Sequence, residues 1–339
     1  MAKSLAIKYR PKTFDDVSEQ DNIKIILKQQ IETDTWKHAY LFCGSAGTGK
    51  TTCARIFANE LGHGKSDVIE RDAASNNGVA DVDEIKRQAN MKSIVSDYKV
   101  FILDECHAFS NSAWQQMLKI LEEPPATSIF IFCTTDPQKI PKTIISRVQR
   151  YDFNRISTKA IVSRLHKILD DEGFNDMDKV VSMESLEYIA KLADGGMRDA
   201  ITMLDKCISY NTDLSIENVV AALGTVDYEE MVSLTDDLLA HKITEVIERL
   251  EVLYAQGKDM KTFLKQYVHF LLDVHKYILG CDWKYIKIPQ TDYCSKWLKK
   301  VCSDDSTLHN IIKALIKTES NIKYSSTPLY DLEASIIAM

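Results

Sequence analysis

One short segment restricts the fold and the chemistry of this chain more than any other. It reads GSAGTGKT, from Gly44 to Thr51, and fits the pattern G-x-x-x-x-G-K-[ST]. An apolar run, AYLFC, precedes it and a helical pattern, TTCARIFANEL, follows it, which is the strand–loop–helix context that the pattern requires. Glycines let the backbone fold around phosphates with N–H groups pointing inward, and the following helix N-terminus adds positive potential. The segment therefore predicts a phosphate-binding loop.

The side chains of this loop have distinct expected tasks. Lys50 is expected to reach the β- and γ-phosphates of ATP, and the Thr51 hydroxyl to bind Mg²⁺. The residues that we expect to contact the nucleotide here are Gly44, Ser45, Ala46, Gly47, Thr48, Gly49, Lys50, Thr51 and Thr52.

A second element, KVFILDECH, ends an apolar run in two carboxylates. Asp104 is placed to hold Mg²⁺, and Glu105 to orient and polarise an attacking water. An apolar strand that ends in Asp-Glu is common by itself, but it becomes specific when it follows a phosphate-binding loop. A further strand that ends in Asp72 lies between the two, which is typical of ATP hydrolases that use a glutamate base. DECH also resembles the DExH box of helicases, but that interpretation needs a second motor domain.

The order of the apolar runs predicts an α/β domain followed by helical domains. Short β-branched or aromatic runs at 39–43, 68–72, 100–103 and 129–133 read as buried parallel strands separated by helices. After residue 156 the strand signals fade. We therefore expect an α/β domain at 1–156, followed by two smaller helical domains at 157–223 and 224–339. The polar stretch 224–227 marks the second boundary, and Leu308, Ile311, Ile312 and Leu315 form an apolar stripe in the last domain.

Composition and charge indicate the compartment, the metal content and the region of DNA contact that we expect. No apolar run reaches the ~18 residues that span a bilayer, and the N-terminus lacks the apolar core of a signal peptide. We therefore expect a cytoplasmic protein. The eight cysteines are dispersed without a C-x-x-C pair, so we expect free thiols and no zinc site. The net charge is −7, most of it after residue 155, so any DNA contact is expected in the near-neutral first part.

Several further phrases identify a family resemblance. They are KYRPKTF, HAYLFCGSAGTGKT, DAASNNGV, LKILEEPPA, TTDPQKIP and GGMRDA. In these phrases the chain resembles the gamma/tau subunits of the bacterial DNA polymerase III clamp loader, which are AAA+ ATPases. The resemblance runs from about residue 6 to beyond residue 225, and weakly to the C-terminus.

The resemblance implies roles for matching residues. Tyr9, Arg10 and Pro11 would contact the adenine side of ATP. Thr135 would be sensor 1, with Thr134 as the fallback assignment. Arg147 would be an arginine finger that acts on ATP bound by a neighbouring subunit, and Arg198 would be sensor 2.

The chain departs from the family pattern in two places. The family usually carries a four-cysteine zinc module after the phosphate-loop helix, whereas here only residues 62–66 join that helix to the next strand, with His63 expected to be a loop residue. Where the family usually has Ser-Arg-Cys, this chain has Ser146-Arg147-Val148, so the arginine of the expected finger is retained. Because the chain stops at Met339, we expect a short form without the long tail of the tau subunit.

The resemblance also implies a function and partners. ATP binding would close a hetero- or homo-pentameric spiral that opens a sliding clamp and grips primer–template DNA, and hydrolysis would release the closed clamp. The chain would thus be an ATPase component of a DNA polymerase holoenzyme, with no membrane partner. DNA contacts are expected from Ser75, Asn76, Asn77 and Gly78, with Lys86 and Arg87 as possible additions. Alternatives are another AAA+ motor such as a branch-migration helicase, a non-catalytic clamp-loader stator, or a simple kinase.

Overall fold

The protein divides into two compact units. A computed structural model describes residues 4–61, 66–91, 97–174, 181–223, 228–289, 291–301 and 305–339. One unit comprises Met1–Gly173 with Ala193–Asp205, and the other comprises Phe174–Leu192 with Lys206–Met339. The expected boundary at 224–227 lies outside the described residues. So does the expected linker with His63, except for its last residue, Ser66.

A five-stranded parallel sheet forms the centre of the first unit, in the order β2-β3-β4-β1-β5. The strands are β1 (Ala39–Cys43), β2 (Ser66–Asp72), β3 (Tyr98–Asp104), β4 (Ser128–Thr134) and β5 (Gln149–Asp152). The four strands expected from the sequence are present, and the α/β class is confirmed. The sequence does not predict the fifth strand, β5, because QRYD has no apolar run: Tyr151 is its one aromatic residue and the one that the structure buries.

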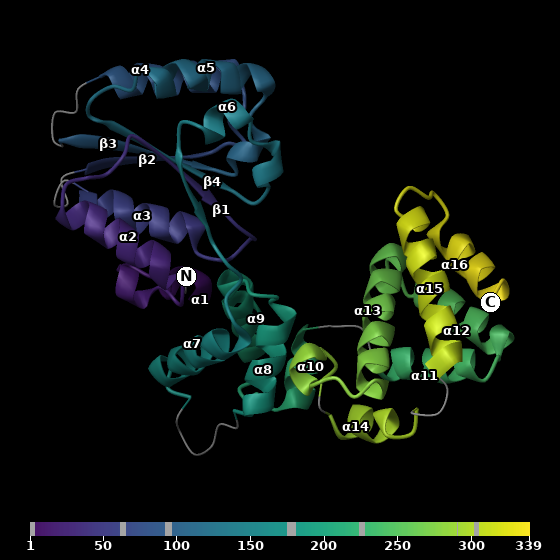
Figure 1. Cartoon of the computed structure of the whole chain (residues 1–339). Coiled ribbons are helices and arrows are strands. Elements are labelled where there is room, and N and C mark those ends of the chain that lie inside the picture. Colours follow the sequence, from purple (N-terminus) through teal and green to yellow (C-terminus); the bar gives the residue numbers. More distant parts are fainter. Residues whose placement is uncertain are drawn as a thin grey trace. The chain divides into compact units, whose positions relative to one another are not determined.

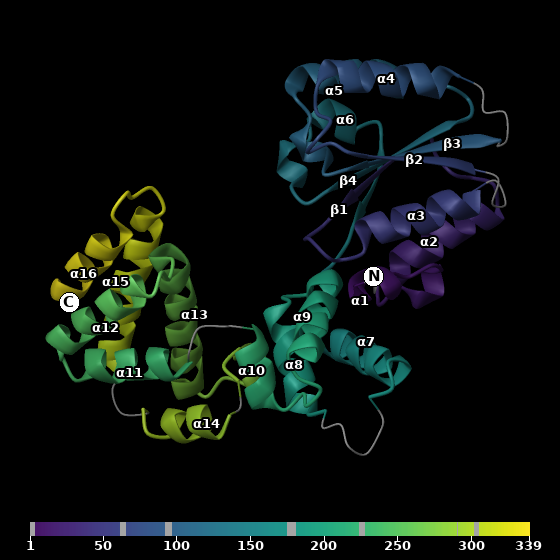
Figure 2. The same ribbon diagram turned by 180° about the vertical axis from the view of Figure 1, so that it is seen from behind.

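Helices cover both faces of this sheet (Figure 1). From behind, α2 and α3 again lie on one face and α4, α5 and α6 on the other (Figure 2). The helices are α2 (Asp21–Glu32), α3 (Lys50–Glu60), α4 (Val79–Asn90), α5 (Asn111–Glu122) and α6 (Lys142–Ile145). Alternating strand residues point to opposite faces. Leu41, Phe101 and Phe130 therefore pack in the core under α4 and α5, and Tyr40 and Ile102 in the core under α2 and α3.

Local sequence signals explain where helix α5 begins and ends. The Ser110 hydroxyl accepts a hydrogen bond from the Ala113 N–H and so satisfies a free donor of the first turn. Pro124 and Pro125 follow the last helical residues and prevent the helix from continuing. The buried positions Trp114, Met117 and Leu121 repeat at helical spacing, as the sequence predicts.

Three more helical segments complete the first unit and bear on its functional site. They are α1 (Leu5–Lys8), α7 (Thr158–Asp171) and the start of α9 (Met197–Tyr210), with the short 3₁₀ helices η1 (Phe14–Asp16), η3 (Cys106–Ala108) and η4 (Pro137–Lys139). The Ser157 hydroxyl accepts from the Ala160 N–H at the start of α7.

The second unit is helical in the part that the structure describes. Its helices are α8 (Met183–Leu192), α10 (Ile216–Leu223), α11 (Tyr228–Leu239), α12 (Ile243–Ala255), α13 (Met260–Ile278), α14 (Asp292–Leu298), α15 (Asp305–Ile322) and α16 (Pro328–Ile337), with η5 (Trp283–Tyr285). The apolar stripe of α15 is buried in the core of this unit, and so it packs within the chain. Among the described helices, none has both the length and the apolar character to cross a membrane.

Candidate functional site

The loop between β1 and α3 has the backbone shape that its glycines allow. Gly44 and Gly47 have φ values of 150° and 72°. A Cβ at Gly44 would lie 2.5 Å from the Phe153 carbonyl oxygen, and one at Gly47 would lie 2.9 Å from the Cα of Gly196. A larger side chain would therefore clash with backbone at both positions. The Met197 N–H also donates to the Gly47 carbonyl at 2.9 Å, which ties the loop to the start of α9.

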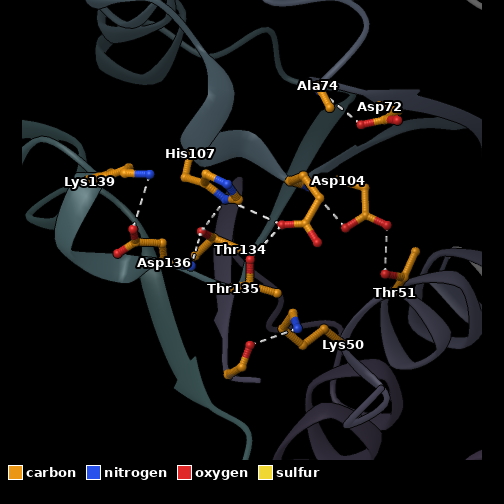
Figure 3. Close-up of polar contacts among 12 residues, drawn as sticks. Lys50, Thr51, Asp72, Ala74, Asp104, His107, Thr134, Thr135, Asp136 and Lys139 are labelled. Atoms are coloured by element: carbon orange, nitrogen blue, oxygen red, sulfur yellow. Dashed lines mark hydrogen bonds and ion pairs between the residues drawn. The ribbon is translucent and has the colours of Figure 1, made fainter. Parts of the chain in front are cut away.

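Lys50 lies inside this loop. It is the first residue of α3 and only 5% exposed. Its Nζ donates to the carbonyl oxygens of Gly44 and Ser45, each at 2.8 Å, and Figure 3 shows the amine directed into the loop. Burial lowers the pKa of Lys50, and the carboxylates of Glu105 and Asp104 partly offset this effect. The loop thus encloses a cation among backbone dipoles.

A hydroxyl and a carboxylate meet where β3 ends. Thr51 Oγ1 donates to Asp104 Oδ2 at 2.8 Å, and the other oxygen of Asp104 accepts from the Glu105 N–H at 3.0 Å (Figure 3). Both side chains are only partly buried. Hard oxygen ligands of this kind are what Mg²⁺ prefers, and it usually takes one or two carboxylates with phosphate and water oxygens. The pair therefore fits a Mg²⁺ site.

The carboxylate of Glu105 is held by neighbours from two strand ends. Glu105 has a left-handed backbone with φ 46°. Its Oε2 accepts from Thr135 Oγ1 at 2.9 Å and lies 3.3 Å from Nδ1 of His107. Thr134, the fallback for sensor 1, is fully buried, and its hydroxyl contacts His107 Nδ1 at 3.3 Å and the Asp136 N–H at 3.0 Å. Thr135 is thus the threonine that touches Glu105.

A cavity of about 270 Å³ joins these groups to the N-terminal segment and to α9. Its lining includes loop residues 46–52, Asp104 and Glu105, and the expected nucleotide contacts Tyr9, Arg10, Pro11 and Arg198. Burial, and then the positive charges of Arg55 and Arg198, lower the pKa of Arg10. Positive charge therefore gathers at this cavity. Gly44 and Ser45 are not among its lining residues, although their carbonyls hold Lys50.

The N-terminal segment is fixed to helices more than 150 residues away in sequence. Tyr9 Oη and Lys8 Nζ both donate to Glu172 Oε1, at 2.7 and 2.5 Å. Arg164 of α7 donates to the Tyr9 carbonyl at 3.0 Å, and the Leu5 N–H donates to Asp205 of α9 at 3.1 Å. The hydrogen bonds from Lys8 and then Tyr9 hold the pKa of Glu172 below its ordinary value. The expected adenine-side residues are thus positioned by α7 and α9.

The described lining of this cavity also does not include Thr135, Arg147 or the turn of Ser75–Gly78, all of which the sequence analysis predicted as functional. Arg147 is exposed, and its guanidinium donates to the Thr143 carbonyl and to Glu122 Oε1, each at 2.8 Å. The turn of Ser75–Gly78 follows β2, where Asn76 Nδ2 donates to the Asp72 carbonyl at 3.0 Å. Asp81 accepts from the Gly78 N–H at 3.0 Å and so occupies a donor at the start of α4.

Sequence reasoning missed three residues of this site: His107, Arg164 and Glu172. His107 carried a signal, because it follows the Asp-Glu pair within DECH, but its contact to the next strand is a tertiary feature. No sequence signal indicated Arg164 and Glu172, because Arg164 lies on α7 and Glu172 directly follows it, both far along the chain from the segment that they hold. Among the described residues, no group of three or more His, Cys, Asp or Glu side chains could hold a metal ion.

Three protein-family models match the chain. A model of the DNA polymerase III delta subunit matches residues 63–157, and a model of the ATPase lid domain of the DNA polymerase III clamp loader subunit matches residues 160–213. A model of domain III of the DNA polymerase III subunits gamma and tau matches residues 214–339.

Individual relatives agree with these models. DNA polymerase III subunit tau of Bacillus subtilis is 36% identical over 353 residues, which cover 97% of this chain and 62% of that protein. DNA polymerase III subunit gamma/tau of Mycoplasma pneumoniae is 31% identical over 300 residues, which cover 82% of this chain and 43% of that protein. The chain therefore spans only about half the length of these relatives.

A solved structure shows the same fold. The RuvB Holliday junction branch migration motor of Thermotoga maritima is similar with a TM-score of 0.53, covering 74% of this chain and 86% of that chain. At 17% identity this likeness shows the fold alone. From the family models and the relatives together, the chain belongs to the gamma/tau family of DNA polymerase III clamp-loader subunits, within the AAA+ proteins.

Proposed function

We propose that this chain is an ATP-hydrolysing clamp-loader subunit that helps to open a sliding clamp and load it on primer–template DNA. One observation carries the proposal. A single cavity joins the glycine-rich loop around Lys50, the Thr51–Asp104 pair, Glu105 and Arg198, in a chain of the gamma/tau family. These are the parts that ATP hydrolysis needs: a phosphate cradle, oxygen ligands for a cation, a base and a further arginine.

The phosphate side of the cavity suits a nucleoside triphosphate. Lys50 supplies a buried positive charge, and the N-terminus of α3 adds its dipole. Thr51 and Asp104 would hold Mg²⁺, which when bound neutralises charge on the phosphate oxygens. The lysine and the loop backbone bind and orient the β- and γ-phosphates.

Glu105 is the general base in this proposal. Its carboxylate accepts a proton from water as the water oxygen bonds to the γ-phosphorus. The bond between that phosphorus and the β–γ bridging oxygen breaks, and ADP and phosphate leave. Thr135 contacts the same carboxylate and so combines the sensor 1 role with orientation of the base.

The remaining roles follow the family resemblance. Tyr9, Arg10 and Pro11 would face the adenine side, and Arg198 would report the γ-phosphate to the lid domain. Arg147, which is exposed and outside the described cavity lining, would act on ATP of a neighbouring subunit. We retain the division into an ATPase domain at 1–156, a lid at 157–223 and a collar at 224–339. In this proposal the collar joins subunits into a pentamer.

DNA would be gripped by the exposed turn after β2. Ser75, Asn77 and Gly78 lie at or near the surface, whereas the Asn76 amide is engaged with the Asp72 carbonyl. Small polar side chains of this kind contact phosphates without reading sequence. Asp81 opposes phosphate binding at the same helix end, so any grip there is weak in one subunit and needs several subunits around the duplex.

The test is ATP hydrolysis by the chain in complex with its other clamp-loader subunits. We expect turnover that rises when clamp and primed DNA are added together, compared with either alone. A motor that moves along DNA would respond to DNA without the clamp, and a stator would bind ATP without hydrolysing it. A kinase would need neither DNA nor clamp.

A further inference from the structure

His107 lies against the carboxylate that we assign as the base. Its Nδ1 is 3.3 Å from Glu105 Oε2 and 3.3 Å from Thr134 Oγ1 (Figure 3). Thr135 donates to the same Glu105 oxygen at 2.9 Å. Two side chains from separate segments thus converge on a single oxygen. Oε1 of Glu105 makes no hydrogen bond with any residue that the structure describes.

The contact determines which form of the histidine is favourable. A carboxylate oxygen only accepts hydrogen bonds, so a bare Nδ1 would set one lone pair against another. A proton on Nδ1 makes the contact attractive. The buried Thr134 hydroxyl is a second neighbour of the same Nδ1, at 3.3 Å, and is itself held by the Asp136 N–H at 3.0 Å.

The backbone explains why these groups meet. Strands β3 and β4 run parallel and adjacent, with Leu103 opposite Phe132, so their carboxyl ends share one edge of the sheet. Glu105 follows β3 in a left-handed conformation, which a residue other than glycine adopts only when its surroundings hold it there. Cys106 is fully buried and anchors the turn η3. This turn brings His107 back towards the end of β4.

We propose that His107 is a positioning residue for ATP hydrolysis. With Thr135 it holds Glu105 by Oε2, which leaves Oε1 to accept the proton of the attacking water. Glu105 is 37% exposed, so packing alone does not fix its carboxylate. A base that is held in one orientation spends more time in the reactive geometry. The inference rests on the proposed function, because it assigns a task only if Glu105 is the base.

Three substitutions of His107 separate its nitrogen from its volume. His107→Asn places an amide N–H close to the position of Nδ1, whereas His107→Gln places it near Nε2. His107→Phe keeps the ring and removes both nitrogens. His269→Phe, at an exposed position of α13, is the matched control. Each variant of the full chain is measured in the assembled complex, with kcat, KM and the Kd for ATP.

We expect His107→Phe and His107→Gln to lower kcat about tenfold or more, but by less than the ~10²–10⁴-fold that the positioned base itself contributes. We expect His107→Asn to restore most of the turnover. The Kd for ATP should stay within about twofold throughout, because His107 acts on the base and not on nucleotide binding. Equal losses in all three variants, or wild-type kcat in His107→Phe, would overturn the inference.

A double substitution tests whether His107 acts through Glu105. Adding His107→Phe to Glu105→Gln should cause no further loss of kcat, because the group that His107 positions is already disabled. Multiplicative losses would overturn the inference while leaving the proposed function intact. A wild-type complex that binds ATP but shows no hydrolysis would instead overturn the proposed function, and the inference with it.

Discussion

Individual residues of the cavity differ in how their charged groups are held, and so in the task that we propose for each. Lys50 is enclosed by loop carbonyls at 2.8 Å, so its charge belongs to the phosphate-binding loop itself. The carboxylate of Glu105 is instead contacted by Thr135 and His107, which lie outside that loop. Removing these two charges should therefore have different consequences.

We predict that Lys50→Ala abolishes ATP turnover and weakens ATP binding about tenfold or more, because it removes a buried cation aimed at the phosphates. Glu105→Gln should keep binding near the wild-type value and lose about 10²-fold or more in kcat. Fluorescent-nucleotide titration and phosphate release give the two quantities. Lys119→Ala, at an exposed position of α5, is the control. Normal hydrolysis by Glu105→Gln would show that another group is the base.

Among the elements, the N-terminal segment shows how a remote helix shapes a binding site. Glu172, which directly follows α7, holds both Lys8 and Tyr9, while Arg164 and Asp205 hold the segment's backbone. Tyr9, Arg10 and Pro11 line the cavity on this segment. Loss of the Glu172 contacts should thus loosen the expected adenine side without touching the phosphate loop.

We predict that Glu172→Gln weakens ATP binding about two- to tenfold, the range of one or two lost hydrogen bonds, with kcat at saturating ATP unchanged. The pKa of Glu172 is lowered in the folded protein, so its contribution to stability is present above its ordinary pKa and is lost as pH falls through the folded pKa. The Tm difference between wild type and variant should therefore shrink below about pH 4. Glu32→Gln, at an exposed position, is the control. A Tm difference between wild type and Glu172→Gln that grows at acid pH would contradict the stabilising role of the Glu172 carboxylate.

The elements also show what sequence can and cannot reveal. Strong local signals predicted β1, β3, β4 and the glycine-rich loop between β1 and α3, because apolar runs and glycines act over a few residues. The strand β5 was missed because its residues are polar except Tyr151, and its place is fixed by pairing with β1. The contacts of His107 and Glu172 were missed for the same reason, since they depend on which segments the tertiary fold brings together.

For the whole molecule, the cysteines bear on zinc content. The seven cysteines that the structure describes are free, and all of them except Cys281 are buried. We predict that the purified protein holds substoichiometric zinc and keeps its Tm in EDTA. Elemental analysis together with thermal unfolding checks this. Stoichiometric zinc with cooperative unfolding on chelation would show that a structural zinc site exists after all.

The assembly of several copies bears on Arg147. Its guanidinium is exposed, contacts Glu122 and Thr143 of its own chain, and is not among the described residues that line the nucleotide cavity. In the proposed function this arginine would supply its charge to an ATP molecule on a neighbouring subunit, and an arginine in that role is worth ~10³–10⁵ in rate. Its effect should therefore depend on assembly.

We predict that Arg147→Ala leaves ATP binding by the isolated chain within about twofold of wild type, and lowers hydrolysis by the assembled complex at least about 10²-fold. Arg150→Ala is the control, because that exposed arginine pairs with Asp152 on β5. If copies of the chain adjoin, mixing Arg147→Ala subunits with Lys50→Ala subunits should restore part of the activity, since one subunit supplies the intact site and the other the arginine. Equal loss of ATP binding by monomeric Arg147→Ala would place the arginine in its own site and remove the main support for hydrolysis between subunits.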